Sequence, residues 1–201
     1  MRILVLCAIL LASPYAWASE DGYVHGDNHC FYFGTPAGWV ADHLSGRNQG
    51  LAFVFYPKGN SWADATTVIY AKVADKSEGV KAPKDQVART LEQFRSQYES
   101  PNISAQHIGT VRATSGAVGQ LYKFTGDKWG NTEFVAYFDG PKTINFFVMS
   151  SRDVSDLEKK RGALEELARS YREAQDCKPC TEARTGQACT QRVEPAAETV
   201  R

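Results

Sequence analysis

The sequence predicts an α+β fold, in which an antiparallel sheet of about six to eight strands is covered by two main helices. Three features support this fold class. Short aromatic or β-branched runs alternate with turns that contain glycine and proline. Two longer stretches place apolar residues at helical spacing. The links between successive strands are short, which makes neighbouring strands antiparallel.

Four strands are expected before the first helix. Residues 31–33 are aromatic, and residues 39–44 follow a turn at 34–38. The run "LAFVFY", residues 51–56, is apolar on both faces and should lie inside a sheet. Residues 66–73 are β-branched and partly alternating, which is typical of a strand. The residues expected in the core are Trp39, Phe53, Phe55, Ile69, Phe134, Phe146 and Leu164.

The first helix is predicted to begin at Pro83 and to stop before Pro101. Proline suits the first turn of a helix because its missing N–H is not needed there. The apolar stripe of this helix is formed by Val87, Leu91, Phe94 and Tyr98.

Four more strands and a second helix follow. The strands are expected at 106–112, 117–125, 132–139 and 143–149, and Gly140-Pro141 indicates a hairpin between the last two. The second helix should be capped by Asp153 or Ser155, and Ser155 with Glu158 matches a capping box. Its buried stripe contains Leu157, Leu164, Leu167, Ala168 and Tyr171.

The opening hairpin resembles that of PsbP-like domains. The resemblance rests on an aromatic-x-aromatic run followed by Pro36-Ala37-Gly38-Trp39, and on the element order from about Phe31 to Tyr171. Related folds include the periplasmic DcrB-like proteins and a nuclear-import factor that binds the GTPase Ran. The resemblance implies a curved antiparallel sheet between helices, in proteins that mostly bind or assist assembly rather than catalyse. It transfers no ligand residues, since no ion-site position of the photosystem subunit can be matched here.

The beginning of the chain has the pattern of a secretory signal peptide. Arg2 precedes an apolar run, and Ala16-Trp17-Ala18 provides small residues for cleavage before Ser19. We therefore expect a signal peptide at 1–18, an extended leader at 19–29, one domain at 30–176 and a cysteine-containing tail at 177–201. The protein should be exported, to the periplasm or beyond, with no membrane insertion after cleavage.

The charge balance argues against nucleic acid as a partner. The chain has 23 basic and 23 acidic residues in interspersed order, and loss of Arg2 would leave one acidic residue in excess. No strong positive field is therefore available to attract nucleic acid or anionic lipid.

Four cysteines would remain in the exported chain. An even number in an oxidising compartment favours disulfides over a metal or redox site. Counting strand directions places Cys30 and the end of the second helix at the same end of the sheet. The predicted bridges are therefore Cys30–Cys177 and Cys180–Cys189, with Cys30–Cys180 and Cys177–Cys189 as the alternative pairing.

Sequence signals for metal binding and catalysis are weak. His25, Asp27 and His29 offer imidazole and carboxylate ligands for zinc or copper, but a polar arm is the favoured interpretation. The chain lacks the Gly-x-Ser-x-Gly, P-loop and Gly-x-Gly-x-x-Gly motifs, so we expect no enzyme and no cofactor. The remaining candidate groups show no pairing in the sequence; they are His43, His107, Asp64, Asp127 and Glu133.

Two tryptophan-containing loops stand out as a possible contact surface. The loops "KGNSWAD" and "GDKWGN" contain Trp62 with Asp64, and Trp129 with Asp127. The strand count places both loops at one end of the sheet, where exposed tryptophans would anchor a protein partner. The alternative is that both side chains fold back over the core.

The sequence thus favours an exported, non-catalytic protein-binding or assembly factor of the bacterial envelope. Its partner is expected to be a protein. The alternative is a periplasmic carrier of a small molecule or metal that uses a pocket between helix and sheet.

Overall fold

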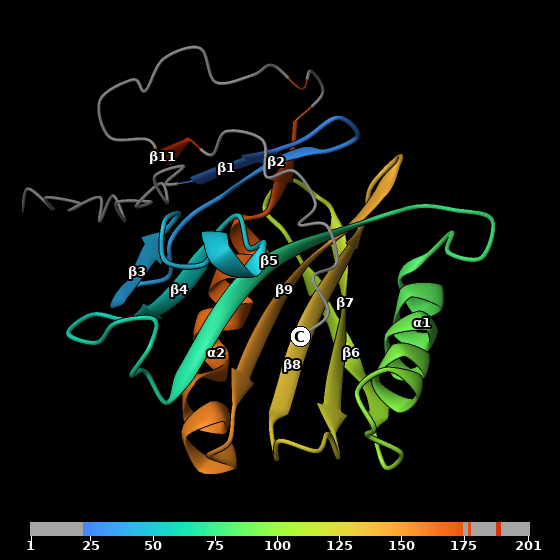
Figure 1. The fold of residues 1–201 in the computed structure, drawn as a ribbon. Coiled ribbons are helices and arrows are strands. Elements are labelled where there is room, and N and C mark those ends of the chain that lie inside the picture. The colour runs from blue at the N-terminus through green and yellow to red at the C-terminus, as the bar shows by residue number, and fades with distance from the viewer. Residues whose placement is uncertain (1–21, 175–176, 178–187, 190–201) are drawn as a thin grey trace, which may run out of the picture.

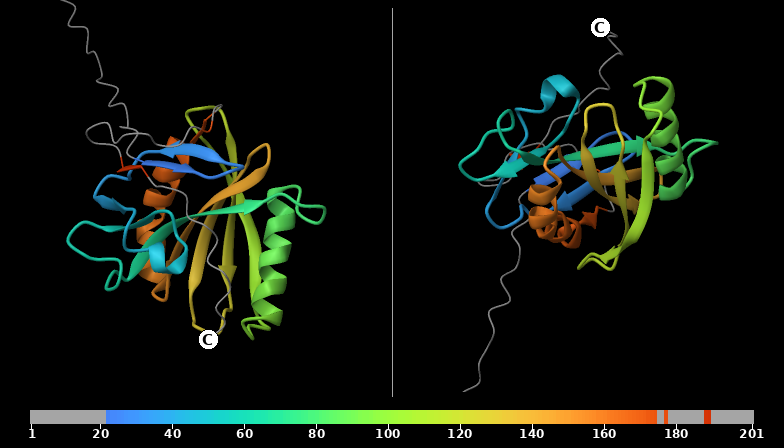
Figure 2. Two further views of the ribbon diagram at one scale, coloured as in Figure 1. Left: turned by 45° about the horizontal axis from the view of Figure 1, so that its top comes forward. Right: turned by 90° about the horizontal axis from the view of Figure 1, so that it is seen from below.

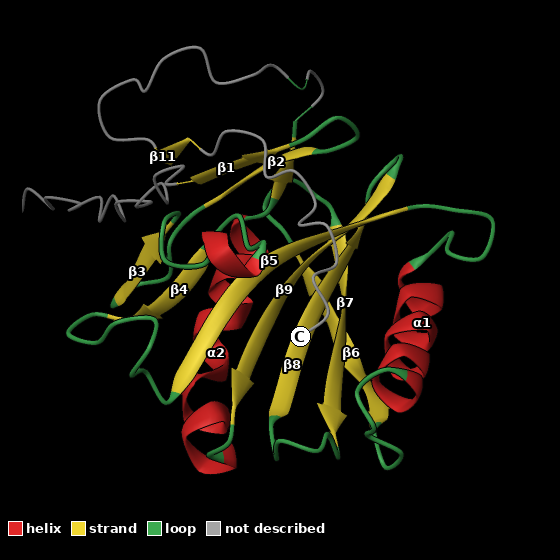
Figure 3. Cartoon of the chain, viewed as in Figure 1, coloured by secondary structure: helices red, strands yellow, loops and turns green. Residues whose placement is uncertain are grey.

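The computed structural model describes residues 22–174, Cys177 and residues 188–189, and it forms the α+β fold that the sequence predicts (Figures 1 and 3). The helices and strands, in chain order, are β1 Gly22–His25, β2 Cys30–Phe33, β3 Trp39–Asp42, the 3₁₀ turn η1 Arg47–Gln49, β4 Val54–Pro57, β5 Thr67–Asp75, α1 Pro83–Ser96, β6 Ser104–Arg112, β7 Val118–Thr125, β8 Thr132–Asp139, β9 Thr143–Ser151, α2 Val154–Ser170, β10 Arg172–Glu173 and β11 Ala188–Cys189.

Seven strands form the main sheet. Their order is β3-β4-β5-β9-β8-β7-β6, and every neighbouring pair is antiparallel, as expected from the short links. The predicted hairpin is confirmed, because Asp139 of β8 pairs with Ile144 of β9 across Gly140-Pro141. The longest connection between two strands of this sheet runs through α1 and joins β5, in the interior of the sheet, to β6 at its edge.

The first predicted strand lies in a second, smaller sheet. There β2 pairs with β1, and the order of this sheet is β10-β2-β1-β11. The strand β1 falls inside the segment expected to be a polar leader, and its Tyr23 and Val24 are buried. The prediction missed β1 because only these two apolar residues mark it. The two-stranded hairpin is stabilised by packing rather than by its own length.

The two faces of the main sheet are covered differently (Figure 2). One face packs against α2 and the small sheet, in a core that includes Phe31, Phe33, Phe55, Phe147 and Leu164. The opposite face packs against α1, in a core that includes Val87, Val135, Tyr137, Phe146 and Val148. The central strands therefore need apolar residues on both sides, which explains why β9 is buried along nearly its whole length.

The core and the second helix follow the predictions closely. All seven residues expected in the core are buried, Trp39 among them at 6% exposure. The five residues predicted for the buried stripe around α2 are buried as well. The helix cap is Asp153, whose carboxylate accepts a hydrogen bond from the Asp156 backbone N–H at 3.0 Å. The predicted capping box of Ser155 and Glu158 is wrong, since the helix begins at Val154.

The first helix begins at Pro83 as predicted, but its apolar stripe is only partly buried. Val87 is buried and Leu91 lies against the core, whereas Tyr98 lies beyond the helix end and is 38% exposed. The part of α1 that packs against the core of the sheet is therefore its N-terminal part, through Val87 and Leu91. Among the residues that the structure describes, no helix has the length and apolarity required to cross a membrane.

The disulfide between Cys30 and Cys177 is present, as predicted. It joins β2 to the segment after α2, with 5.3 Å between the two Cα atoms and 147 residues between them in sequence. The Ala174 N–H also donates to the Cys30 carbonyl oxygen at 2.9 Å, so the backbone supports the same junction. The second predicted bridge stays a prediction, because Cys180 lies outside the described residues.

Candidate binding surface at the loop end of the sheet

The two tryptophan loops emerge at the same end of the main sheet, as the strand count predicts. Thr67, which follows the first loop, and Thr132, which follows the second, both pair with Ser151 at the end of β9. We call this end, formed by residues 58–66 and 126–131, the loop end; in Figure 1 the loop between β4 and β5 lies at the lower left and the loop between β7 and β8 at the bottom. A contact surface that uses both loops is therefore geometrically possible.

Trp129 is the more exposed of the two tryptophans at this end. Its side chain is 43% exposed and belongs to neither core cluster. The indole ring packs against Tyr98 at 5.9 Å and Phe94 at 6.3 Å between ring centroids, while the Lys128 ammonium lies 5.2 Å from the indole centroid. Because Tyr98 is itself 38% exposed, Trp129 and Tyr98 form one aromatic patch on the surface.

Hydrogen bonds within its loop hold Trp129 in place. The Asp127 carboxylate accepts from the backbone N–H groups of Trp129 at 3.1 Å and Asn131 at 2.7 Å, and from the Asn131 amide at 2.8 Å. The Lys128 N–H donates to the Ser100 hydroxyl at 3.0 Å, and this contact ties the loop to the chain after α1. Asp127 therefore stabilises the conformation of the loop. This role is structural, whereas the prediction from the sequence was contact with a partner.

The second loop is arranged differently. Trp62 is partly buried, and its ring meets Tyr70 of β5 edge to face at 6.3 Å. Asp64 is exposed and accepts a hydrogen bond from Ser61 within the same loop. Neither tryptophan belongs to a core cluster; Trp62 packs against Tyr70 of the sheet, whereas Trp129 packs against Phe94 of α1 and Tyr98. Of the four residues proposed for partner contact, Trp129 is therefore the best placed.

Tyr70 links this loop to a carboxyl group on the sheet. Its hydroxyl donates to Glu133 of β8 at 3.2 Å. Burial raises the pKa of Glu133, against the opposing effect of hydrogen bonds from Ser150 and Tyr70. Burial, together with the negative charge of Glu133, also raises the pKa of Tyr70 well above its usual value. The sequence pattern indicated Glu133 only as a carboxyl group without a partner. Its hydrogen bond with Tyr70 could not be predicted, because the two residues are 63 positions apart.

The residues proposed as a metal-site alternative lie in the β1–β2 hairpin. His25 stacks on Tyr23 at 5.6 Å, and burial lowers the pKa of His29. Within residues 22–174, 177 and 188–189, no group of three or more His, Cys, Asp or Glu side chains is arranged to hold a metal ion. The hairpin is thus explained as part of the small sheet.

The remaining histidines are held by ordinary neighbours. His107 lies 3.0 Å from Gln120 and packs against Tyr122 at 5.0 Å, whereas His43 packs against Phe53 at 6.2 Å. These neighbours account for the positions of both imidazole rings.

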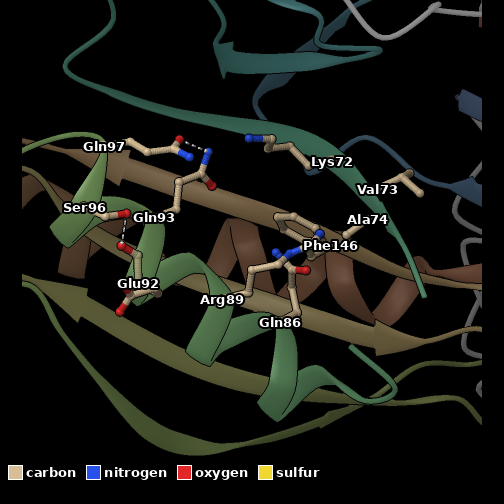
Figure 4. A pocket seen from close by; sticks show the side chains of 10 residues that line it. All are labelled: Lys72, Val73, Ala74, Gln86, Arg89, Glu92, Gln93, Ser96, Gln97 and Phe146. Atoms are coloured by element: carbon tan, nitrogen blue, oxygen red, sulfur yellow. Dashed lines mark hydrogen bonds between the residues drawn. The ribbon is translucent and has the colours of Figure 1, made fainter. Parts of the chain in front are cut away.

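A groove lies between α1 and the sheet, on the face that α1 covers (Figure 4). Its volume is about 500 Å³, which is within the range of small-molecule sites. The residues that line it are Lys72, Val73, Ala74, Gln86, Arg89, Glu92, Gln93, Ser96, Gln97 and Phe146. The groove thus lies between a helix and the sheet, where the alternative prediction of a small-molecule or metal carrier expects a pocket.

Comparison with known proteins adds likenesses of fold only. No protein family matches the sequence, and no curated protein matches it either. The chain is similar to the solved structure of the cyanobacterial PsbP protein CyanoP from Synechocystis sp. PCC 6803, at 14% identity and a TM-score of 0.46, over 72% of this chain and 86% of CyanoP. It is also similar to the Ran-binding protein Mog1p from Saccharomyces cerevisiae, at 11% identity and a TM-score of 0.45, over 71% of this chain and 89% of Mog1p. Because both TM-scores lie below 0.5, membership in the PsbP-like or DcrB-like proteins stays a prediction.

Proposed function

We propose that this chain is an exported, non-catalytic protein-binding or assembly factor whose contact surface is the aromatic patch of Trp129 and Tyr98. The observation that carries the proposal is the combination of a large exposed ring with a fixed loop. Tryptophan and tyrosine are the residues that most often supply binding energy in protein interfaces. A patch already held by Asp127 loses little conformational freedom when a partner binds.

Export is the second part of the proposal. It rests on the signal-peptide pattern at 1–18 and is supported by the Cys30–Cys177 bridge, since disulfides persist mainly outside the cytoplasm. Secretion accessories and immunity proteins against secreted toxins are the classes of protein that fit such a role. The partner is a protein of the envelope or of the exterior.

The test uses the chain without residues 1–18, immobilised and exposed to an envelope extract of the source cells. A captured protein is then purified, and its affinity is measured for the unsubstituted chain and for Trp129→Ala. We expect Trp129→Ala to weaken binding roughly 30-fold, which corresponds to the ~2 kcal/mol of an interface anchor. Circular dichroism and thermal melting establish that the variant is folded.

The matched control is Leu44→Ala. Leu44 is 58% exposed and lies after β3, at the opposite end of that strand from the loop end. Its removal should leave the affinity unchanged. Equal binding by the Trp129→Ala variant, or an equal loss in both variants, would show that the aromatic patch is not the contact surface.

A further inference from the structure

The groove beside α1 has an aromatic floor and cationic walls. Lys72 of β5 and Phe146 of β9 are direct partners in the antiparallel register, so their side chains stand side by side on the same face of the sheet. Arg89 belongs to α1 and lines the groove from the helix side. Figure 4 shows Lys72, Phe146 and Arg89 around the same space.

The two cations of the groove are not neutralised by ion pairs. Neither Lys72 nor Arg89 forms an ion pair with another residue in the described part of the chain, although six such pairs occur elsewhere in it. Glu92 is the acidic residue on the lining. Glu133 does not line the groove, although the positive charge of Lys72 lowers the Glu133 pKa slightly against the effect of burial. The lining thus has two positive charges against one negative charge, which favours an anionic ligand.

Gln86 gives the groove a second, independent feature. Its side chain is buried at 7% exposure, and its amide nitrogen donates to the Thr90 hydroxyl at 3.2 Å. The amide oxygen Oε1 is buried without any hydrogen-bond partner, and it is the one such buried side-chain atom among the described residues. Buried polar atoms are nearly always hydrogen-bonded in native proteins, so this oxygen calls for a donor that the chain itself does not provide. Gln86 is also one of the residues that line the groove.

We infer that the groove binds a small organic carboxylate with a flat apolar body and a hydroxyl or amino group. The carboxylate would lie between Lys72 and Arg89, and the apolar body would lie against Phe146. The hydroxyl or amino group would donate to the Gln86 amide oxygen. An arginine and a lysine provide charge-assisted hydrogen bonds to such a carboxylate. This inference is independent of the protein-binding surface, because Trp129 does not line the groove.

The first experiment titrates the exported form of the chain with 4-hydroxybenzoate and follows backbone amide signals by nuclear magnetic resonance. We expect shifts that saturate and that cluster at Lys72, Ala74, Gln86, Arg89 and Phe146. The neutral analogue 4-hydroxybenzamide should bind roughly fivefold or more weakly, since it lacks the charge. Equal affinity for the two probes, or shifts scattered away from the groove, would overturn the inference. Inorganic phosphate that competes as well as the carboxylate would overturn it too, since the site would then hold a simple anion.

The second experiment uses substitutions at exposed positions, so that folding is preserved. Lys72→Ala and Arg89→Ala should each weaken 4-hydroxybenzoate roughly fivefold. Lys84→Ala is the matched control, because Lys84 is an exposed cation on α1 that does not line the groove. A loss of the same size in the control would mean that net charge, rather than this site, determines binding.

The role of Gln86 is tested with a pair of probes. Benzoate lacks the hydroxyl of 4-hydroxybenzoate, so it should bind the unsubstituted chain more weakly. In Gln86→Leu the two probes should bind with equal affinity, because the oxygen that accepts from the hydroxyl is gone. An unchanged preference for 4-hydroxybenzoate in this variant would show that the hydroxyl binds elsewhere, and the assignment of Gln86 would be wrong.

Discussion

At the scale of single residues, Glu133 is the least expected feature of the molecule. It pairs in register with Ser150 of β9, which pairs in turn with Val68 of β5, and it accepts a hydrogen bond from the Tyr70 hydroxyl. Burial disfavours its charged form, and the nearby charge of Asp127 acts in the same direction. The hydroxyl groups of Tyr70 and Ser150 offset this effect only in part, because the pKa of Glu133 is still raised.

A raised pKa makes the stability of the fold depend on pH. Below the pKa of Glu133 in the unfolded chain, the group is protonated in both states. As the pH rises through the higher pKa of the folded state, the folded form loses stability relative to the unfolded form. Glu133→Gln retains an oxygen for the Tyr70 hydroxyl but has no charge to bury. We therefore expect its free energy of unfolding, relative to the unsubstituted chain, to be higher at pH 7 than at pH 4.

Chemical denaturation at a series of pH values measures this difference. Glu78→Gln is the control, since Glu78 is exposed in the loop before α1. The control should follow the unsubstituted chain at every pH. A Glu133→Gln variant with the same pH profile as the unsubstituted chain would mean that Glu133 is well solvated in the folded state.

At the scale of elements, the two helices differ in how the chain fixes their first turns. In α1, the Asp85 carboxylate accepts from the backbone N–H groups of Lys81 and Ala82, and Pro83 needs no partner. In α2, Asp153 accepts from the Asp156 N–H, while Asp156 itself accepts from the Thr67 hydroxyl at 2.6 Å and the Lys160 ammonium at 2.5 Å. The start of α2 is thereby joined to β5.

Removal of the α2 cap should be measurable. Asp153→Ala leaves the Asp156 N–H without its acceptor, so we expect a loss of about 1 kcal/mol in the free energy of unfolding. Ser155→Ala tests the capping box suggested by the sequence. It should cost much less, because Ser155 is exposed and the helix is capped by Asp153 instead. Urea denaturation of both variants distinguishes the two caps, and a larger loss for Ser155→Ala would contradict the observed helix start.

At the scale of the whole molecule, the Cys30–Cys177 bridge joins the two ends of the described fold. It links β2 of the small sheet to the chain after α2, across 147 residues. Closing so long a loop in the unfolded chain removes much of its conformational freedom. The expected stabilisation is about 5 kcal/mol on the chain-entropy model.

Cys177→Ser is the suitable variant, because Cys177 is exposed and its replacement leaves the buried Cys30 side chain in place. In oxidised protein we expect the free energy of unfolding to fall by roughly 4–5 kcal/mol, with a clearly lower melting temperature. In the presence of reductant, the variant and the unsubstituted chain should unfold alike. An oxidised variant as stable as the unsubstituted chain would show that the bridge adds little, and four free thiols in the chain without residues 1–18 would show that it does not form.

The sequence by itself determined the elements whose signal is local. The strand at 132–139 and the buried stripe of α2 were predicted residue by residue, because periods of two and of 3.6 are imposed by the backbone alone. The direction of each strand also followed from the sequence, since short links reverse the chain. That reasoning placed both tryptophan loops at one end and Cys30 near Cys177.

Only the tertiary structure decided how distant residues meet. The pairing of Tyr70 with Glu133 depends on the order β5-β9-β8, which brings together side chains 63 positions apart. The strand β1 forms because Val24 packs into the core and Tyr23 stacks on Tyr32 of β2, contacts that no local pattern predicts. The different exposure of Trp62 and Trp129 has the same origin. Burial depends on which surfaces the whole fold brings together, whereas periodicity depends only on neighbouring residues.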